Sequence, residues 1–161
     1  QNMYFSSVLG CNLGMFYKRR DYTRVVNGRN PIVAHEYLGD SVEGKTVFIA
    51  DDIIASGESM LEVASNLKVR GAKRIIADAT FPLFTSGLDK FDKAVEEGTL
   101  DYVVGTNLTY RKPELLNRDW YVDVDVSKYA AYFIVALNHD MSVSSIIDPI
   151  KKIEALLASR K

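Results

Sequence analysis

The alternation of apolar and polar positions along the chain predicts strands separated by helices. Short apolar runs bounded by glycine or polar turns predict strands at residues 13–17, 32–38, 47–50, 74–79, 102–105 and 120–124. Apolar residues at helical spacing predict helices at 3–9, 60–67, 88–95, 129–137 and 150–157, with their apolar faces turned inward. Strands that alternate with helices favour parallel pairing, so the chain is expected to be an α/β fold with a mostly parallel sheet flanked by helices.

Residues 46 to 60 contain most of the candidate ligand-binding groups. Their order is a buried strand, two carboxylates (Asp51 and Asp52), a loop of small residues, and a helix. In a parallel sheet the carboxyl ends of the strands form the ligand crevice, and a loop that opens a helix offers backbone N–H groups to an anion. A phosphate would then lie on residues 55–59, with hydroxyls from Ser56 and Ser59, while the two carboxylates accept hydrogen bonds from sugar hydroxyls. The pattern predicts a sugar-phosphate ligand.

Two other interpretations of nearby residues have to be weighed. In one, these residues only connect a strand to a helix, since an Asp in the turn and a Ser near the helix start are common in α/β chains. The spacing leaves this alternative open. Residues 39–46 match the nucleotide-binding pattern GxxxxGK[ST]. That motif requires a helix after the loop, whereas here a strand follows, so we interpret these residues as a turn into the strand.

A basic segment, with Lys18, Arg19 and Arg20 at its start, follows the first predicted strand. We expect residues 18–31 to form an exposed mobile loop, since turn dipeptides and charges dominate them. A run of this kind is often only a solvated face. Because it follows a strand, it is also expected at the same edge as the carboxylates, where cations suit the charge of a transferring phosphoryl group.

Composition excludes several classes of function. The 161 residues suit one domain, are 47% hydrophobic and 25% charged, and carry a net charge of −1, which gives no reason to expect nucleic acid or an acidic membrane as partner. One cysteine and two histidines offer no internal disulfide and no zinc site, and no metal ligand is assigned in this chain. Apolar runs stay below the ~18 residues of a membrane helix, so a cytoplasmic protein is expected.

The chain resembles the ribose-phosphate pyrophosphokinases, also called phosphoribosyl pyrophosphate synthetases, and especially the longer bacterial form. The matching pieces lie in the same order along almost the whole chain: K-R-R at 18–20, V-E-G-K at 42–45, F-I-A-D-D-I-I-A-S-G-E-S at 48–59, L-K-V-R-G-A at 67–72, T-N-L at 106–108, V-D-V-S at 124–127 and S-V-S-S at 142–145. The resemblance is to the C-terminal half of such an enzyme, with residues 1–161 as one phosphoribosyltransferase-like domain and the N-terminal half absent.

The resemblance implies a type I phosphoribosyltransferase fold and transfer of pyrophosphate from ATP to ribose 5-phosphate, with Mg²⁺ whose ligands lie mostly outside this chain. Asp51 and Asp52 would bind the ribose hydroxyls, and Lys18 and Arg20 would act on the transferring phosphoryl group. It also implies a homo-oligomer, and an isolated chain that is incomplete as an enzyme. The 5-phosphate would be held by the 55–59 loop, which consists of Ala55, Ser56, Gly57, Glu58 and Ser59.

The 55–59 loop also departs from the family. Many relatives have Asp at Ala55, Thr at Ser56 and Gly at Glu58, and the charge of Glu58 should weaken phosphate binding unless its carboxylate points away. Three functions stay open: a pyrophosphokinase domain, a non-catalytic regulatory or assembly paralogue, and a phosphoribosyltransferase acting on a nucleobase.

Overall fold

The chain separates into two compact units, Gln1–Ser41 and Val42–Lys161. The structure, a computed structural model, describes residues 2–20 and 32–159, without the side chains of 18–20, 32–35 and 145. Within these residues no helix is long and apolar enough to cross a membrane. That the 161 residues form a single domain stays a prediction.

The first unit is a helix followed by an antiparallel hairpin. It contains α1 (Asn2–Leu9), β1 (Met15–Arg20) and β2 (Ile32–Leu38), and β1 pairs with β2 from Met15 opposite Leu38 onward. The rings of Phe16 and Tyr37 lie 5.2 Å apart on this hairpin. The prediction that a loop begins at Lys18 is wrong, because cross-strand pairing keeps the backbone of Lys18 to Arg20 in β1. The rest of the predicted loop, residues 21–31, lies outside the described residues.

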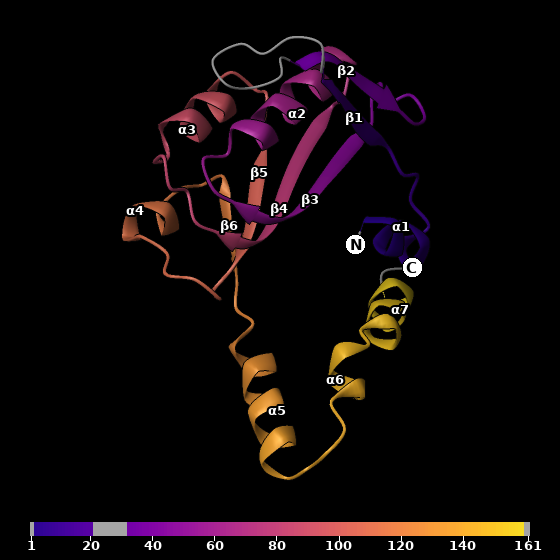
Figure 1. The fold of residues 1–161 in the computed structure, drawn as a ribbon, viewed down its shortest axis with the longest axis vertical. Coiled ribbons are helices and arrows are strands. Elements are labelled where there is room, and N and C mark those ends of the chain that lie inside the picture. Colours follow the sequence, from indigo (N-terminus) through magenta and orange to yellow (C-terminus); the bar gives the residue numbers. More distant parts are fainter. Residues whose placement is uncertain (1, 21–31, 160–161) are drawn as a thin grey trace. The chain divides into compact units, whose positions relative to one another are not determined.

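The second unit is built on a four-stranded sheet with the order β3-β4-β5-β6 (Figure 1). The strands are β3 (Thr46–Ile54), β4 (Arg74–Pro82), β5 (Tyr102–Thr106) and β6 (Tyr121–Val124). All three pairings are parallel, which confirms the sheet predicted from the alternation of strands and helices. Thr46 begins β3 directly after the turn, and the Gly44 amide donates to the Gly71 carbonyl over 2.8 Å, so the turn-into-strand interpretation of residues 39–46 is confirmed.

One face of this sheet forms the core. Ile75, Ala77, Ala79 and Val103 point to the same side of adjacent strands and are fully buried. The helix α2 (Glu58–Val69) lies across this face and turns Met60, Ala64 and Leu67 inward at helical spacing (Figure 1). The sheet is further flanked by α3 (Asp89–Glu96) and by the short helix α4 (Pro113–Leu116), which the apolar spacing did not predict. The opposite face keeps exposed apolar side chains, with Phe48 56% exposed.

The last part of the chain forms three helices, α5 (Ser127–Asn138), α6 (Ser144–Ile147) and α7 (Ile150–Ala158). Their predicted inward faces are only partly realised. In α5 Ala136 is buried but Leu137 is 69% exposed, and α7 buries none of its residues. The expectation of buried faces was wrong here because an amphipathic pattern needs a packing surface, and the described residues supply little of one to these helices.

Candidate functional site

Residues 55–57 of the 55–59 loop join β3 to α2 at the carboxyl edge of the parallel sheet, while Glu58 and Ser59, predicted as loop, form the start of α2. Gly57 is the N-cap of α2, and the first helical amide to find a carbonyl is that of Leu61, which donates to Gly57 over 3.0 Å. The amides ahead of Leu61 have no intrahelical acceptor, as at the start of any helix, and they are available to an anion. Among the described residues, the Ser56 and Ser59 hydroxyls have no hydrogen-bond partner. The predicted order of strand, loop and helix is therefore confirmed, and the loop offers donors.

Gly57 sets the conformation of this loop. Its φ of +77° lies in the left-handed region that favours glycine. The Phe91 ring of α3 packs directly beneath it, and a Cβ added at Gly57 would clash with that ring. Phe91 is fully buried, with the Phe84 ring 4.8 Å and the Trp120 ring 5.9 Å away. An aromatic cluster thus supports the loop from below.

The two carboxylates lie within β3 rather than after it. The sequence predicted that the strand ends at Ala50, but Asp51, Ile53 and Ile54 continue the pairing with β4. Both carboxylates are exposed, and the Asp52 amide donates to the Asp51 carboxylate over 2.8 Å. Because consecutive strand residues project to opposite sides of a sheet, the two side chains do not form a pair on one face.

Glu58 forms an ion pair with the neighbouring helix. The Lys90 ammonium of α3 donates to a Glu58 carboxylate oxygen over 2.6 Å, and both side chains are mostly exposed. This hydrogen bond, together with the positive charge of Lys90, lowers the pKa of Glu58 below its ordinary value. The carboxylate that was expected to repel a phosphate therefore already has a cation beside it.

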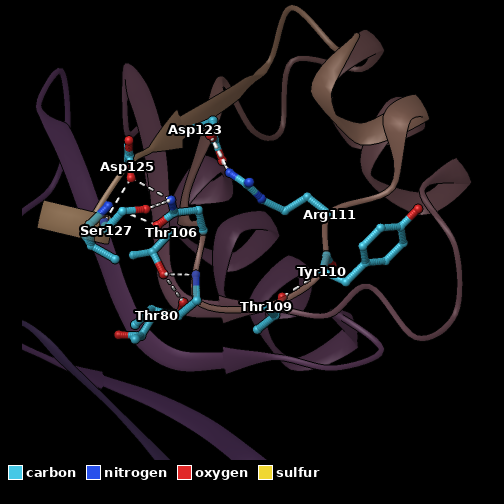
Figure 2. A network of polar contacts seen from close by, with 11 residues as sticks. Thr80, Thr106, Thr109, Tyr110, Arg111, Asp123, Asp125 and Ser127 are labelled. Carbon is cyan, nitrogen blue, oxygen red and sulfur yellow. Dashed lines mark hydrogen bonds and ion pairs between the residues drawn. The ribbon is translucent and has the colours of Figure 1, made fainter. Parts of the chain in front are cut away.

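A second polar network lies at the same edge, where β5 and β6 end (Figure 2). Asn107 is its centre: the side-chain amide donates to Asp125 over 2.6 Å and to the Ser127 hydroxyl over 2.8 Å, and its carbonyl accepts from the Val126 amide. Asp125 also accepts from the amide of Ser127, the first residue of α5. Hydrogen bonds from Ser127 and then from Asn107 lower the pKa of Asp125.

The rest of the network links strand ends. The Thr106 hydroxyl donates to the Thr80 carbonyl over 2.6 Å, which joins β5 to β4, and the Arg111 guanidinium pairs with Asp123 of β6 (Figure 2). Residues 106–108 and 124–127 are marks of resemblance in the sequence, and their contacts with one another were not predicted from it. The sequence signal that could have predicted them is Asn107 after one strand, with Asp125 and Ser127 after the next strand.

The Tyr121 side chain is buried at this edge of the sheet. Its hydroxyl is buried and has no hydrogen-bond partner within residues 2–20 and 32–159. Burial, then the charge of Asp123, raises the pKa of Tyr121 to about 12. Since an unpaired buried hydroxyl is destabilising, Tyr121→Phe is expected to raise the free energy of unfolding by about 1 kcal/mol. Urea denaturation measures this, with Tyr110→Phe, 80% exposed, as the control that should change nothing. A Tyr121→Phe chain less stable than the original would show that the hydroxyl has a partner.

Lys18 and Arg20 belong to a different compact unit from the carboxylates and the 55–59 loop. Their backbone lies in β1 of the first unit, while the carboxylates and the 55–59 loop lie in the second. Their side chains are outside the described residues, so their roles stay predictions. Among the residues that the structure describes, no group of three or more histidine, cysteine or acidic side chains is placed to hold a metal ion.

Comparison with known proteins gives one consistent match. Residues 3–127 match the family model described as a phosphoribosyl transferase domain. The ribose-phosphate pyrophosphokinase of Wolinella succinogenes is 35% identical over 111 residues, which are 69% of this chain and 33% of that protein. That of Thermotoga maritima is 31% identical over 140 residues, 86% of this chain and 40% of that protein.

A solved structure has the same fold. The crystal structure of phosphoribosylpyrophosphate synthetase from Mycobacterium smegmatis matches 86% of this chain and 41% of its own chain, with a TM-score of 0.64 and 22% identity. The resemblance read from the sequence and the type I phosphoribosyltransferase fold are therefore confirmed. The chain spans about a third to two fifths of the length of these relatives.

Proposed function

Because this chain belongs to the phosphoribosyl transferase domain family, we propose that it is the part of a ribose-phosphate pyrophosphokinase that binds ribose 5-phosphate. The observation that carries the proposal is the 55–59 loop, with unpaired helix amides and two hydroxyls, directly after a strand that carries two exposed carboxylates. An anion site beside an acidic site fits a ligand with a phosphate at one end and hydroxyls at the other.

Different residues would bind the phosphate and the sugar of the ligand. The 5-phosphate accepts from the loop amides and from Ser56 and Ser59, and the ribose 2- and 3-hydroxyls donate to Asp51 and Asp52. Since these carboxylates project to opposite sides of β3, a sugar that reaches both has to lie across the strand. One oxygen of Asp51 already accepts the Asp52 amide, which leaves Asp52 the greater capacity for the sugar.

In the proposed reaction the 1-hydroxyl oxygen of the sugar forms a bond to the β-phosphorus of ATP. The bond from that phosphorus to the bridging oxygen breaks, AMP leaves, and the hydroxyl proton is lost. Lys18 and Arg20 would stabilise the charge on the transferring group. The reaction uses Mg²⁺ in our proposal, but the described residues do not by themselves form a site for it, so no step is assigned to a metal held here. The segments of the longer relatives that this chain does not match would supply the rest of the ATP site, and the assembly would be a homo-oligomer.

Two other functions predict different results in binding experiments. A regulatory or assembly paralogue would fold and associate without saturable binding of the sugar phosphate; the departures at Ala55 and Glu58 favour it. A phosphoribosyltransferase would bind the pyrophosphorylated sugar together with a nucleobase.

Calorimetric titration with ribose 5-phosphate, with and without Mg²⁺, tests the proposal. Saturable binding is expected, weakened about tenfold by Asp52→Asn and several-fold by Ser56→Ala, since each change removes hydrogen bonds of about 1 kcal/mol. Asp119→Asn, at the amino end of β6, and Ser65→Ala, on the exposed side of α2, are matched controls that should bind normally. A folded chain that does not bind the sugar phosphate would contradict the proposal and favour the regulatory paralogue.

A further inference from the structure

Glu58 occupies a place where an acidic side chain competes with a bound phosphate. It is the first residue of α2, where the positive end of the helix dipole attracts anions. With no cation nearby, its carboxylate would both repel a phosphate on the 55–59 loop and satisfy the same helix terminus from within the chain.

Lys90 is held where it can offset that charge. The next residue of α3 is Phe91, whose buried ring packs against Gly57 of the loop, so the start of α3 is anchored to the loop. From this anchored position the Lys90 ammonium reaches the Glu58 carboxylate at 2.6 Å. Further along the same helix, Lys93 pairs instead with Glu97, the C-cap residue of α3, at 3.7 Å.

We infer that Lys90 is a positioning residue for the phosphate: it neutralises Glu58 and draws its carboxylate toward α3, so that the 55–59 loop accepts an anion although it contains an acidic residue. This inference rests on the proposed function, because it concerns the same loop. It assigns to Lys90 an effect that operates through Glu58.

A double-mutant cycle measured by calorimetry at low ionic strength tests this coupling, with inorganic phosphate and ribose 5-phosphate as probes. Lys90→Gln is expected to weaken the binding of both by about threefold, the scale of one exposed charge. In a Glu58→Gln background the same substitution should change binding by less than about 1.5-fold, since the charge to be offset is gone. Lys90→Arg should restore the affinity, and the loss should fade near 1 M salt.

Lys93→Gln is the matched control, an exposed lysine on the same helix that should leave binding unchanged. Equal losses in both backgrounds, no loss in the original background, or an unaltered chain that does not bind phosphate would each overturn the inference. Failure of the proposed function looks different: phosphate binds, but ribose 5-phosphate binds no more tightly and Asp52→Asn has no effect. The cycle with phosphate then still decides the role of Lys90.

Discussion

Gly57→Ala is expected to lower the free energy of unfolding by about 3 kcal/mol and to weaken ribose 5-phosphate binding more than tenfold. Two costs combine. An alanine at a φ of +77° costs roughly 1–2 kcal/mol, and forcing its Cβ against Phe91 costs a further 1–3 kcal/mol. Either the loop or the Phe91 ring has to move, and a moved loop no longer directs its amides and hydroxyls at one phosphate.

Gly98→Ala separates the two costs. Gly98 has a similar φ of +69°, but a Cβ there would have nothing within 4 Å. Its substitution should cost only about 1 kcal/mol and leave binding intact. Urea denaturation gives the stabilities, and titration with ribose 5-phosphate gives the affinities. Equal destabilisation of the two variants would mean that Phe91 does not restrict the loop.

The predictable part of this fold is the part encoded by local pattern. The strand that contains Val47 and the helix that carries Met60, Ala64 and Leu67 follow from short apolar runs and helical spacing. The lengths of the strands did not follow. Asp51 and Asp52 look like the start of a loop, yet β3 continues because its neighbour β4 pairs with it, and a partner distant in sequence leaves no local mark.

The candidate site divides in the same way. The donors of the 55–59 loop could be predicted, because a strand, a small-residue loop and a helix lie together in the sequence. The supports of the loop could not. Phe91 lies beneath Gly57, and Lys90 pairs with Glu58 across 32 positions of sequence. Such contacts depend on how α2 and α3 pack, and side-chain types do not specify that packing by themselves.

Asp92 carries the strongest of these long-range contacts. Its carboxylate accepts two hydrogen bonds of 2.8 Å from the Arg118 guanidinium and one of 2.7 Å from the Trp120 indole, and so joins α3 to the segment before β6. Burial alone would raise the pKa of Asp92, but the hydrogen bonds from Arg118 and Trp120 and the charge of Arg118 together lower it below its ordinary value.

Asp92→Asn is therefore expected to lower the free energy of unfolding by about 2 kcal/mol at pH 7, a value reduced because the side chain is one third exposed. A carboxylate whose pKa is lower in the folded state stabilises the fold above about pH 4 and loses this effect as the pH falls through the folded-state pKa. The difference between the original chain and Asp92→Asn should thus be largest near neutrality and shrink below pH 4.

Urea denaturation at pH 7, 5 and 3.5 measures this difference, with the exposed Glu96→Gln of the same helix as the control that stays close to the original chain at pH 7. A difference that does not change with pH would mean that Asp92 acts by shape and not by charge. Because Asp92 is adjacent to Phe91 and binds Trp120, both of them in the cluster beneath Gly57, its loss should also weaken ribose 5-phosphate binding. Asp92→Asn should weaken it less than Gly57→Ala does, since the loop keeps its own conformation while only its support loosens.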